Sequence, residues 1–238
     1  MKKAVLIPCT RAHLFISCFM MLSYISVSAQ DKADTLVAYN KNGRWGFVAR
    51  NVTSVTFRIE PAYEAVYPFY EGRAAIMKNG LLGFIDATGR QIIACEYDIV
   101  KGYRFTKGLV AVKRGTTYGV IDKNGKTVQP FNFMDATIYG DAGVLVATLP
   151  DTKNPVNMMG LAGMYDMQGK QLLQHEYENI DPALHKNAIV LSRNDLRSLV
   201  NAKGAAFTTK WYKTLVFSDI SHFIGPGVYT WQILQAGY

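Results

Sequence analysis

Paired acidic residues are the first candidates for chemistry in this sequence of 238 residues. Glu96 and Asp98, and again Glu176 and Glu178, stand two positions apart, so on a β-strand both members of a pair would share one face. Two carboxylates arranged in this way could serve as the acid and base of a glycosidase. The pairs recur at corresponding places in the chain, however, and such repetition is typical of packing. We therefore predict no catalytic residue and no enzyme activity.

Histidine and cysteine residues do not form a metal-ligand pattern. His175, His185 and His222 have no partner at ligand spacing, and Cys95 is the one cysteine beyond position 18. The segment Gly160-Leu161-Ala162-Gly163 lacks the lysine of a phosphate loop, and Gly-x-Ser-x-Gly is absent. We expect no zinc site and no cofactor, and we interpret Cys95 as a buried small apolar residue.

Three aspartates precede glycine turns at a constant distance of three positions: Asp86, Asp122 and Asp166. Calcium loops concentrate several oxygen ligands within about a dozen residues, whereas each of these turns offers one carboxylate. Aspartate side chains also accept hydrogen bonds from backbone N–H groups two residues further on. We predict that each aspartate caps its turn and that none of them binds a metal.

Aromatic residues provide the one binding signal in the sequence. A cluster within nine residues is followed by two tyrosines at similar places further on, which would form a periodic strip. Such a strip could stack against sugar rings or a peptide, or it could fill the joints between structural units. Its members are Tyr63, Tyr67, Phe69, Tyr70, Tyr97 and Tyr103.

The N-terminus has the features of a secretory signal peptide. Lys2, Lys3 and Arg11 precede an apolar run from Leu14 to Val27, which is too short for a comfortable membrane span. Val27 and Ala29 fit the pockets of a signal peptidase, so we place cleavage between Ala29 and Gln30 and assign residues 1–29 to the signal, an apolar helix. Processing as a lipoprotein before Cys18 is the alternative.

Removal of the signal changes the charge of the chain. The net charge of +8 falls to +5, because 23 basic and 18 acidic residues remain after position 29. These charges are scattered and not clustered, which argues against nucleic-acid binding. Cys95 is then alone, so no internal disulfide can form and the core must depend on packing. We expect no transmembrane span in the mature chain.

A repeat organises residues 30–238. A small residue at positions 46, 83, 119, 163 and 198 recurs at separations of 37, 36, 44 and 35 residues. A second glycine follows six positions later, and an aromatic residue fourteen positions later, in units two to five. Loops inserted near residues 51–56 and 149–155 explain the longer spacings. The defining positions are Trp45, Gly46, Gly83, Gly119, Gly163, Gly89, Gly125, Gly169 and Gly204.

These landmarks resemble the WG repeat family of bacterial proteins, named for a Trp-Gly pair. The literal pair occurs at Trp45-Gly46, and the family's tyrosine-acid element matches Tyr63-Glu64 and Tyr97-Asp98. The resemblance covers about residues 36–225 and is weakest in the fifth unit, where Ser198 replaces the glycine. It implies binding or scaffolding and brings no catalytic residue with it.

Each unit is predicted to contain three short antiparallel strands. Asn42-Gly43 and Asn79-Gly80 favour the positive φ angles of tight hairpins. In the central strand, two neighbouring positions are both apolar, so an adjoining unit should cover each face. We expect an aromatic ring of a neighbouring strand or unit to lie over the strand glycines. Because one unit buries too little surface alone, the units must share a core.

The prediction is therefore an all-β tandem array of about five units, open and curved in preference to a closed propeller. The units are 36–72, 73–108, 109–143, 144–188 and 189–225, and residues 226–238 suggest the start of a further unit. We expect an exported protein, periplasmic or at the outer cell envelope of a Gram-negative bacterium. Its expected role is a protein or peptide interaction module, with a carbohydrate-binding accessory protein as the alternative.

Overall fold

The computed structural model describes residues 36–49, 57–98, 103–185, 188–213 and 215. The predicted signal peptide, its cleavage site at Ala29, the insertion at 51–56 and the further unit at 226–238 lie outside these residues. Within the described part of the chain, no helix has the length and apolar character needed to cross a membrane.

Seventeen β-strands form the regular structure of the described residues, and they group into five antiparallel sheets. Each sheet is a continuous meander in which strands that follow one another in sequence are paired. The sheets are β1 (Leu36–Lys41), β2 (Arg44–Ala49) and β3 (Phe57–Tyr63); β4 (Ala65–Val66), β5 (Ala74–Lys78), β6 (Leu81–Ile85) and β7 (Gln91–Tyr97); β8 (Leu109–Arg114), β9 (Thr117–Asp122) and β10 (Thr127–Phe133); β11 (Asp135–Tyr139), β12 (Val144–Leu149), β13 (Leu161–Asp166) and β14 (Gln171–Tyr177); and β15 (Asn179–His185), β16 (Ala188–Arg193) and β17 (Leu196–Val200).

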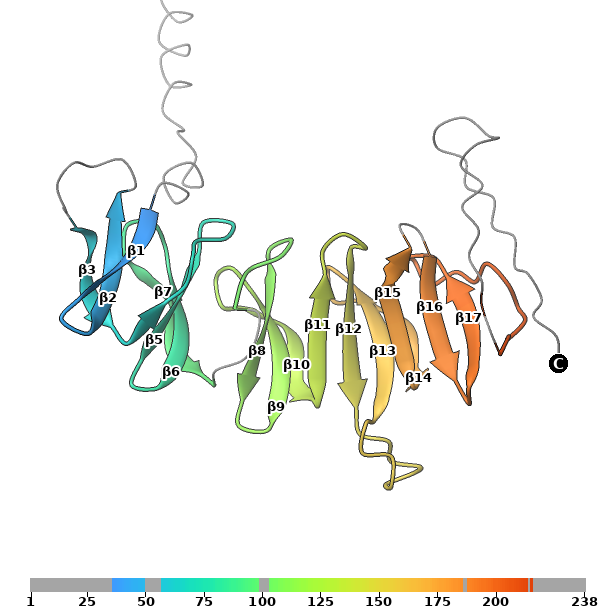
Figure 1. The fold of residues 1–238 in the computed structure, drawn as a ribbon. Helices are drawn as coiled ribbons and strands as arrows, with labels where there is room; N and C mark the ends of the chain where they lie inside the picture. Colours follow the sequence, from blue (N-terminus) through green and yellow to red (C-terminus); the bar gives the residue numbers. More distant parts are fainter. Residues whose placement is uncertain (1–35, 50–56, 99–102, 186–187, 214, 216–238) are drawn as a thin grey trace, which may run out of the picture.

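The five sheets stand side by side in chain order and form an open row (Figure 1). This arrangement confirms the predicted all-β tandem array. The positive φ angles predicted for the first two hairpins are also present, at 53° and 82° for Asn42-Gly43 and at 55° and 73° for Asn79-Gly80.

The sheets are offset from the units expected from the sequence. An additional strand of two to seven residues follows the aromatic residue that ends the preceding sheet, and it pairs with the opening strand of the next unit; these strands are β4, β11 and β15. A sheet therefore begins directly after Tyr63, Phe133 or Tyr177, and two sheets have four strands. In the fifth sheet, isolated bridges of Ala206 and Tyr212 to β17 replace a regular last strand.

The core lies between the sheets and not within them. In β9, Val120 packs into the cluster shared with the fourth sheet, whereas its neighbour Ile121 packs into the cluster shared with the second. In β13, Met164 faces the fifth sheet and Tyr165 faces the third. Successive side chains of a strand point to opposite faces, so the central strands β6, β9 and β13 of the three inner sheets each pack into two interfaces between neighbouring sheets, which we call joints. This confirms the prediction that neighbouring units cover both faces.

The central-strand glycines leave room for the third strand of the same sheet. A Cβ atom on Gly119 would lie 2.8 Å from the Phe131 ring, and one on Gly163 would lie 2.9 Å from the His175 ring. The expected ring over the glycine is thus confirmed in these two sheets. At Gly46 and Gly83 the expectation of a ring is wrong, because the nearest atoms there belong to backbone, chiefly the carbonyl oxygens of Ile59 and Ile93. The third strand is bulged opposite all four glycines, which brings it this close.

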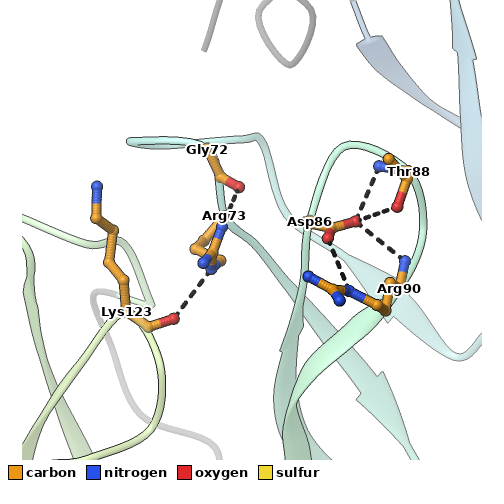
Figure 2. A network of polar contacts seen from close by, with 6 residues as sticks. All are labelled: Gly72, Arg73, Asp86, Thr88, Arg90 and Lys123. Carbon is orange, nitrogen blue, oxygen red and sulfur yellow. Dashed lines mark hydrogen bonds and ion pairs between the residues drawn. The ribbon is translucent and has the colours of Figure 1, made fainter. Parts of the chain in front are cut away.

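The turns after the central strands are capped by their aspartates, as predicted. Asp86 Oδ1 accepts hydrogen bonds from the backbone N–H groups of Thr88 and Arg90 at 2.9 and 3.1 Å, and from the Thr88 hydroxyl (Figure 2). The i+2 and i+4 backbone groups repeat these bonds to Asp122, Asp166 and Asn201. Beside the first of these turns, Arg73 Nε donates to the Lys123 carbonyl oxygen at 3.0 Å and so links the second sheet to the third (Figure 2).

Candidate functional site

The predicted aromatic strip lies mostly within the joints. Phe69 and Tyr97 are buried, and Tyr63 packs against the core between the first two sheets. The rings of Tyr67 and Tyr103 lie with their centroids 4.0 Å apart against the next joint. Burial, followed by the hydrogen bond with Tyr103, raises the pKa of Tyr67 to about 12. These five rings contact one another or the core.

Tyr70 is the exposed member of the strip. Its side chain is 40% exposed, and the Arg104 guanidinium lies 5.5 Å from the ring centroid. A guanidinium at this distance makes a cation–π contact, which occupies one surface of the ring. The strip therefore does not present a row of free rings in the described part of the chain.

The acidic pairs also lie at the joints. Glu96 bonds Arg114 at 2.9 Å, and Glu176 lies 3.5 Å from Arg193 at the corresponding place two sheets further on. The Arg114 guanidinium covers the ring of Phe131 at 4.6 Å, and Phe131 in turn stacks on Tyr97 of the preceding sheet. This group of contacts supports the prediction that the pairs belong to the repeat.

The acid that follows Tyr63, Tyr97 or Tyr177 caps a hairpin of the next unit. Glu64 accepts hydrogen bonds from the Asn79 and Gly80 N–H groups, both at 2.9 Å. Asp98 accepts from Gly115 at 2.6 Å and Glu178 from Asn194 at 3.0 Å. The two bonds to Glu64, chiefly that of Gly80, lower the pKa of its carboxyl group. An acid of one unit thus fixes the first turn of the next.

One joint departs from this pattern. Met134 occupies the place of the acid between the third and fourth sheets, and its backbone N–H still bonds the opening strand, at the Thr148 oxygen. A thioether cannot cap a turn as a carboxylate does. The two-residue hairpin is replaced here by a loop of residues 150–160 between β12 and β13, which projects from the lower edge of the array in Figure 1. The inserted loop was predicted from the sequence.

Polar contacts give this loop a defined shape. Asp151 accepts hydrogen bonds from the Lys153 and Asn154 N–H groups at 3.0 Å and from the Asn157 side chain at 3.2 Å. The Asn157 amide also donates to the Gly160 carbonyl oxygen, and its own oxygen accepts from the Met159 N–H. The bond from Asn157, followed by that from Asn154, lowers the pKa of Asp151.

The loop holds apolar side chains in water. Val156 is 85% exposed, Met158 84% and Met159 82%, while Met134 at the base of the loop is 39% exposed. We call Val156, Met158 and Met159 the apolar tip. Contiguous apolar side chains on a protein surface mark interaction sites. This feature was not predicted from the sequence, although the missing acid at Met134 coincides with the longest spacing between repeats.

Residues considered for metal chemistry occupy other environments. His175 stacks on Phe133, and its Nε2 is hydrogen-bonded to the Tyr165 hydroxyl at 2.7 Å. Its Nδ1 lies 3.1 Å from the Leu161 carbonyl oxygen, which can only accept a hydrogen bond. Burial lowers its pKa. Cys95 is half-buried against the first joint, His222 lies outside the described residues, and nothing is described of the His185 side chain.

Comparison with known proteins identifies the repeat. Residues 56–81 and 83–115 match the family described as "WG containing repeat". These two segments of the chain carry WG repeats. The tyrosine-acid elements at 63–64 and 97–98 lie inside the two matched segments, and the strand glycine Gly83 begins the second segment. No curated protein matches the WG-repeat chain.

Solved structures similar to the WG-repeat chain share little sequence with it. A eukaryotic initiation factor is 7% identical, with 75% of this chain and 53% of that chain covered and a TM-score of 0.47. Hsv2p of Kluyveromyces lactis is 12% identical, with 76% and 61% covered and a TM-score of 0.42. AztD of Citrobacter koseri is 13% identical, with 77% and 61% covered and a TM-score of 0.33. The chain spans between half and two thirds of the length of these structures.

Proposed function

We propose that this WG-repeat chain is a non-catalytic, exported interaction module that docks a protein partner through the apolar tip. The observation that carries the proposal is the exposure of Val156, Met158 and Met159, each more than four-fifths, on an internally hydrogen-bonded loop. Fully burying one such side chain in a partner stabilises the complex by roughly 1.5–3 kcal/mol. Because the loop is held in shape before binding, little conformational entropy is lost on docking.

The chemistry of the loop favours an apolar protein pocket as its receptor. Residues 150–160 carry one acid and one base, Asp151 and Lys153, so the loop has no net charge. Attachment to an anionic membrane surface needs basic residues beside the apolar ones. Methionine side chains are flexible and polarizable, which suits them to fill an irregular protein cavity. The convex tip therefore fits a concave apolar site.

The repeat explains how the tip is presented. Sheets packed on both faces form a firm row, and insertions into single repeats commonly build a binding surface on one side of such an array. At the joint between the third and fourth sheets, Met134 replaces the capping acid and the loop of residues 150–160 replaces the short hairpin. In this proposal, the other joints serve as the scaffold that supports the loop.

A photo-crosslinking experiment tests the proposal. A photoreactive amino acid is placed at position 158 of the full-length protein in its native cells, with a matched control at exposed Asn124 on the opposite edge. We expect one protein to crosslink at 158 and not at 124. The purified partner should then bind the M158D/M159D variant at least about tenfold more weakly than the wild type. Equal crosslinking at both positions, or crosslinking to lipid, would contradict the proposal. Reproducible sugar binding that is lost in the Y70A variant would favour the carbohydrate alternative.

A further inference from the structure

The described methionines differ widely in their exposure to solvent. Met158 and Met159 are 84% and 82% exposed, whereas Met164 is fully buried in the joint with the fifth sheet. Met77 and Met167 are half-buried, and Met134 is intermediate between these groups. A peroxide must reach the thioether sulfur to oxidise it, so exposure controls the rate. The two residues of the tip are therefore the most accessible methionines in the described part of the chain.

The loop does not use these two side chains to keep its shape. Its hydrogen bonds come from Asp151, Asn157 and the backbone, including the Met159 N–H group. An oxygen added to either sulfur would face water and would break none of these bonds. Oxidation should consequently change the polarity of the tip without unfolding the loop or the sheets.

We propose that Met158 and Met159 form a reversible oxidation site, at which a hydroperoxide converts the apolar tip into a polar one. In this step the sulfur attacks one peroxide oxygen, the O–O bond breaks as the S–O bond forms, and the sulfur loses two electrons. Hydrogen peroxide is reduced to water. A dithiol reductant reverses the step and is itself oxidised to a disulfide, with the sulfoxide oxygen leaving as water. The effect on partner binding rests on the proposed function, whereas the modification itself does not.

The site is tested first without any partner. The purified protein is treated with limiting hydrogen peroxide, and peptide mass spectrometry follows the oxidation of each methionine with time. We expect Met158 and Met159 to oxidise at least about tenfold faster than Met164, with the melting temperature unchanged. A dithiol and a methionine sulfoxide reductase should restore the original mass. Similar rates at all methionines, or unfolding on oxidation of the tip, would overturn the proposal.

A second measurement follows the polarity of the surface. Retention of the native protein on a phenyl column should fall after oxidation and return after reduction. The matched variant M158Q/M159Q, which carries polar side chains of similar length, should elute early and should not shift on oxidation. If oxidation leaves the retention of the wild type unchanged, the tip is not switched and the proposal is wrong.

The two proposals can fail separately. Selective, reversible oxidation that leaves the affinity for the crosslinked partner unchanged would support the oxidation site and contradict docking through the tip. A partner that crosslinks at position 158 while Met158 and Met159 oxidise no faster than Met164 would support docking and overturn the oxidation site. If both proposals hold, oxidation should weaken partner binding by about as much as M158Q/M159Q does.

Discussion

Phe84 and Ile85 are neighbours in β6, yet their side chains belong to different joints. Phe84 packs with the third sheet, beside Phe105 and Val110, whereas Ile85 packs with the first sheet, beside Phe47 and Ile59. Both side chains are fully buried. A single strand thereby connects two cores, and the same relationship recurs in β9 and β13. The row of sheets is stable because each of the three inner sheets is covered on two faces.

The contact between Gly119 and Phe131 predicts a cost for any added atom. The substitution Gly119→Ala places a Cβ 2.8 Å from the ring, and overpacking of this kind costs about 1–3 kcal/mol. In an F131A background the obstructing ring is absent, so the same substitution should cost little. Urea unfolding of the two single variants and the double variant measures this coupling.

Gly83→Ala provides the control for this cycle. The obstruction at Gly83 is the Ile93 carbonyl oxygen and neighbouring backbone, which removal of Phe131 cannot relieve. Its cost should therefore be the same with and without F131A. Equal costs of G119A in both backgrounds would show that the ring does not require the glycine.

The Glu64 cap predicts a pH-dependent contribution to stability. Its pKa is lowered from 4.5 by the Gly80 and Asn79 N–H groups, so the folded state favours the ionised carboxylate. The contribution is present above this value and is lost as the pH falls through the folded-state pKa. Glu64→Gln should lower the urea midpoint at neutral pH and converge with the wild type in acid. Exposed Glu60→Gln serves as the control, and a constant difference at all pH values would contradict the cap.

Protonation of His175 should weaken the joint between the third and fourth sheets. Burial lowers its pKa below 6.5, so the unfolded chain takes up the proton more readily than the folded chain. Stability associated with this group is therefore complete above about pH 6.5 and decreases as the pH falls below that value. His175→Phe keeps a ring over Gly163 and removes the titration. As the pH is lowered from about 7.5 to about 5, the melting temperature should fall less in the variant than in the wild type. An equal fall in both proteins would refute this role.

The fourth hairpin can be converted to the form found in the first. Residues 150–160 are replaced by Asn-Gly, which then connects Leu149 to Leu161. These two residues are already paired across β12 and β13, just as Lys41 and Arg44 are paired on either side of Asn42-Gly43. Because the tip lies in water, the melting temperature should change by less than about 3 °C. Adding Met134→Glu should stabilise this shortened protein by supplying the missing cap, and should not stabilise the wild type. Thermal unfolding of the wild type and the shortened protein, each with and without M134E, measures this difference. A higher melting temperature of M134E in the wild-type background would contradict the assigned role of the acid.

Much of the fold could be predicted from the sequence because its determinants are local. Asn79-Gly80 favours a tight turn wherever it occurs, and Asp86 bonds atoms only two and four residues away. The additional strand β4 could not be predicted, because Ala65 and Val66 are too few to show a pattern. Their place depends on pairing with Met77 and Ile76, which lie twelve and ten residues further along the chain.

The candidate site was harder to predict than the fold. Val156, Met158 and Met159 are apolar, and apolar residues are ordinarily expected to be buried. Their exposure follows from the hydrogen bonds of Asp151 and Asn157, which no periodicity reveals. Conversely, Tyr67 and Tyr97 belong to a group of aromatic residues that is typical of a binding surface. They lie in joints instead, because repeated sheets need large side chains between them.

Native-state hydrogen exchange of two mild variants tests the two-sided packing most directly. Phe84→Leu should speed amide exchange in β6 and in β8 and β9 of the third sheet, and should leave β2 of the first sheet protected. Ile85→Val should speed exchange in β6 and β2 and leave β8 and β9 protected. If both variants loosen the same set of strands, then the two neighbouring residues do not serve separate joints, and the array is not held together in the way described.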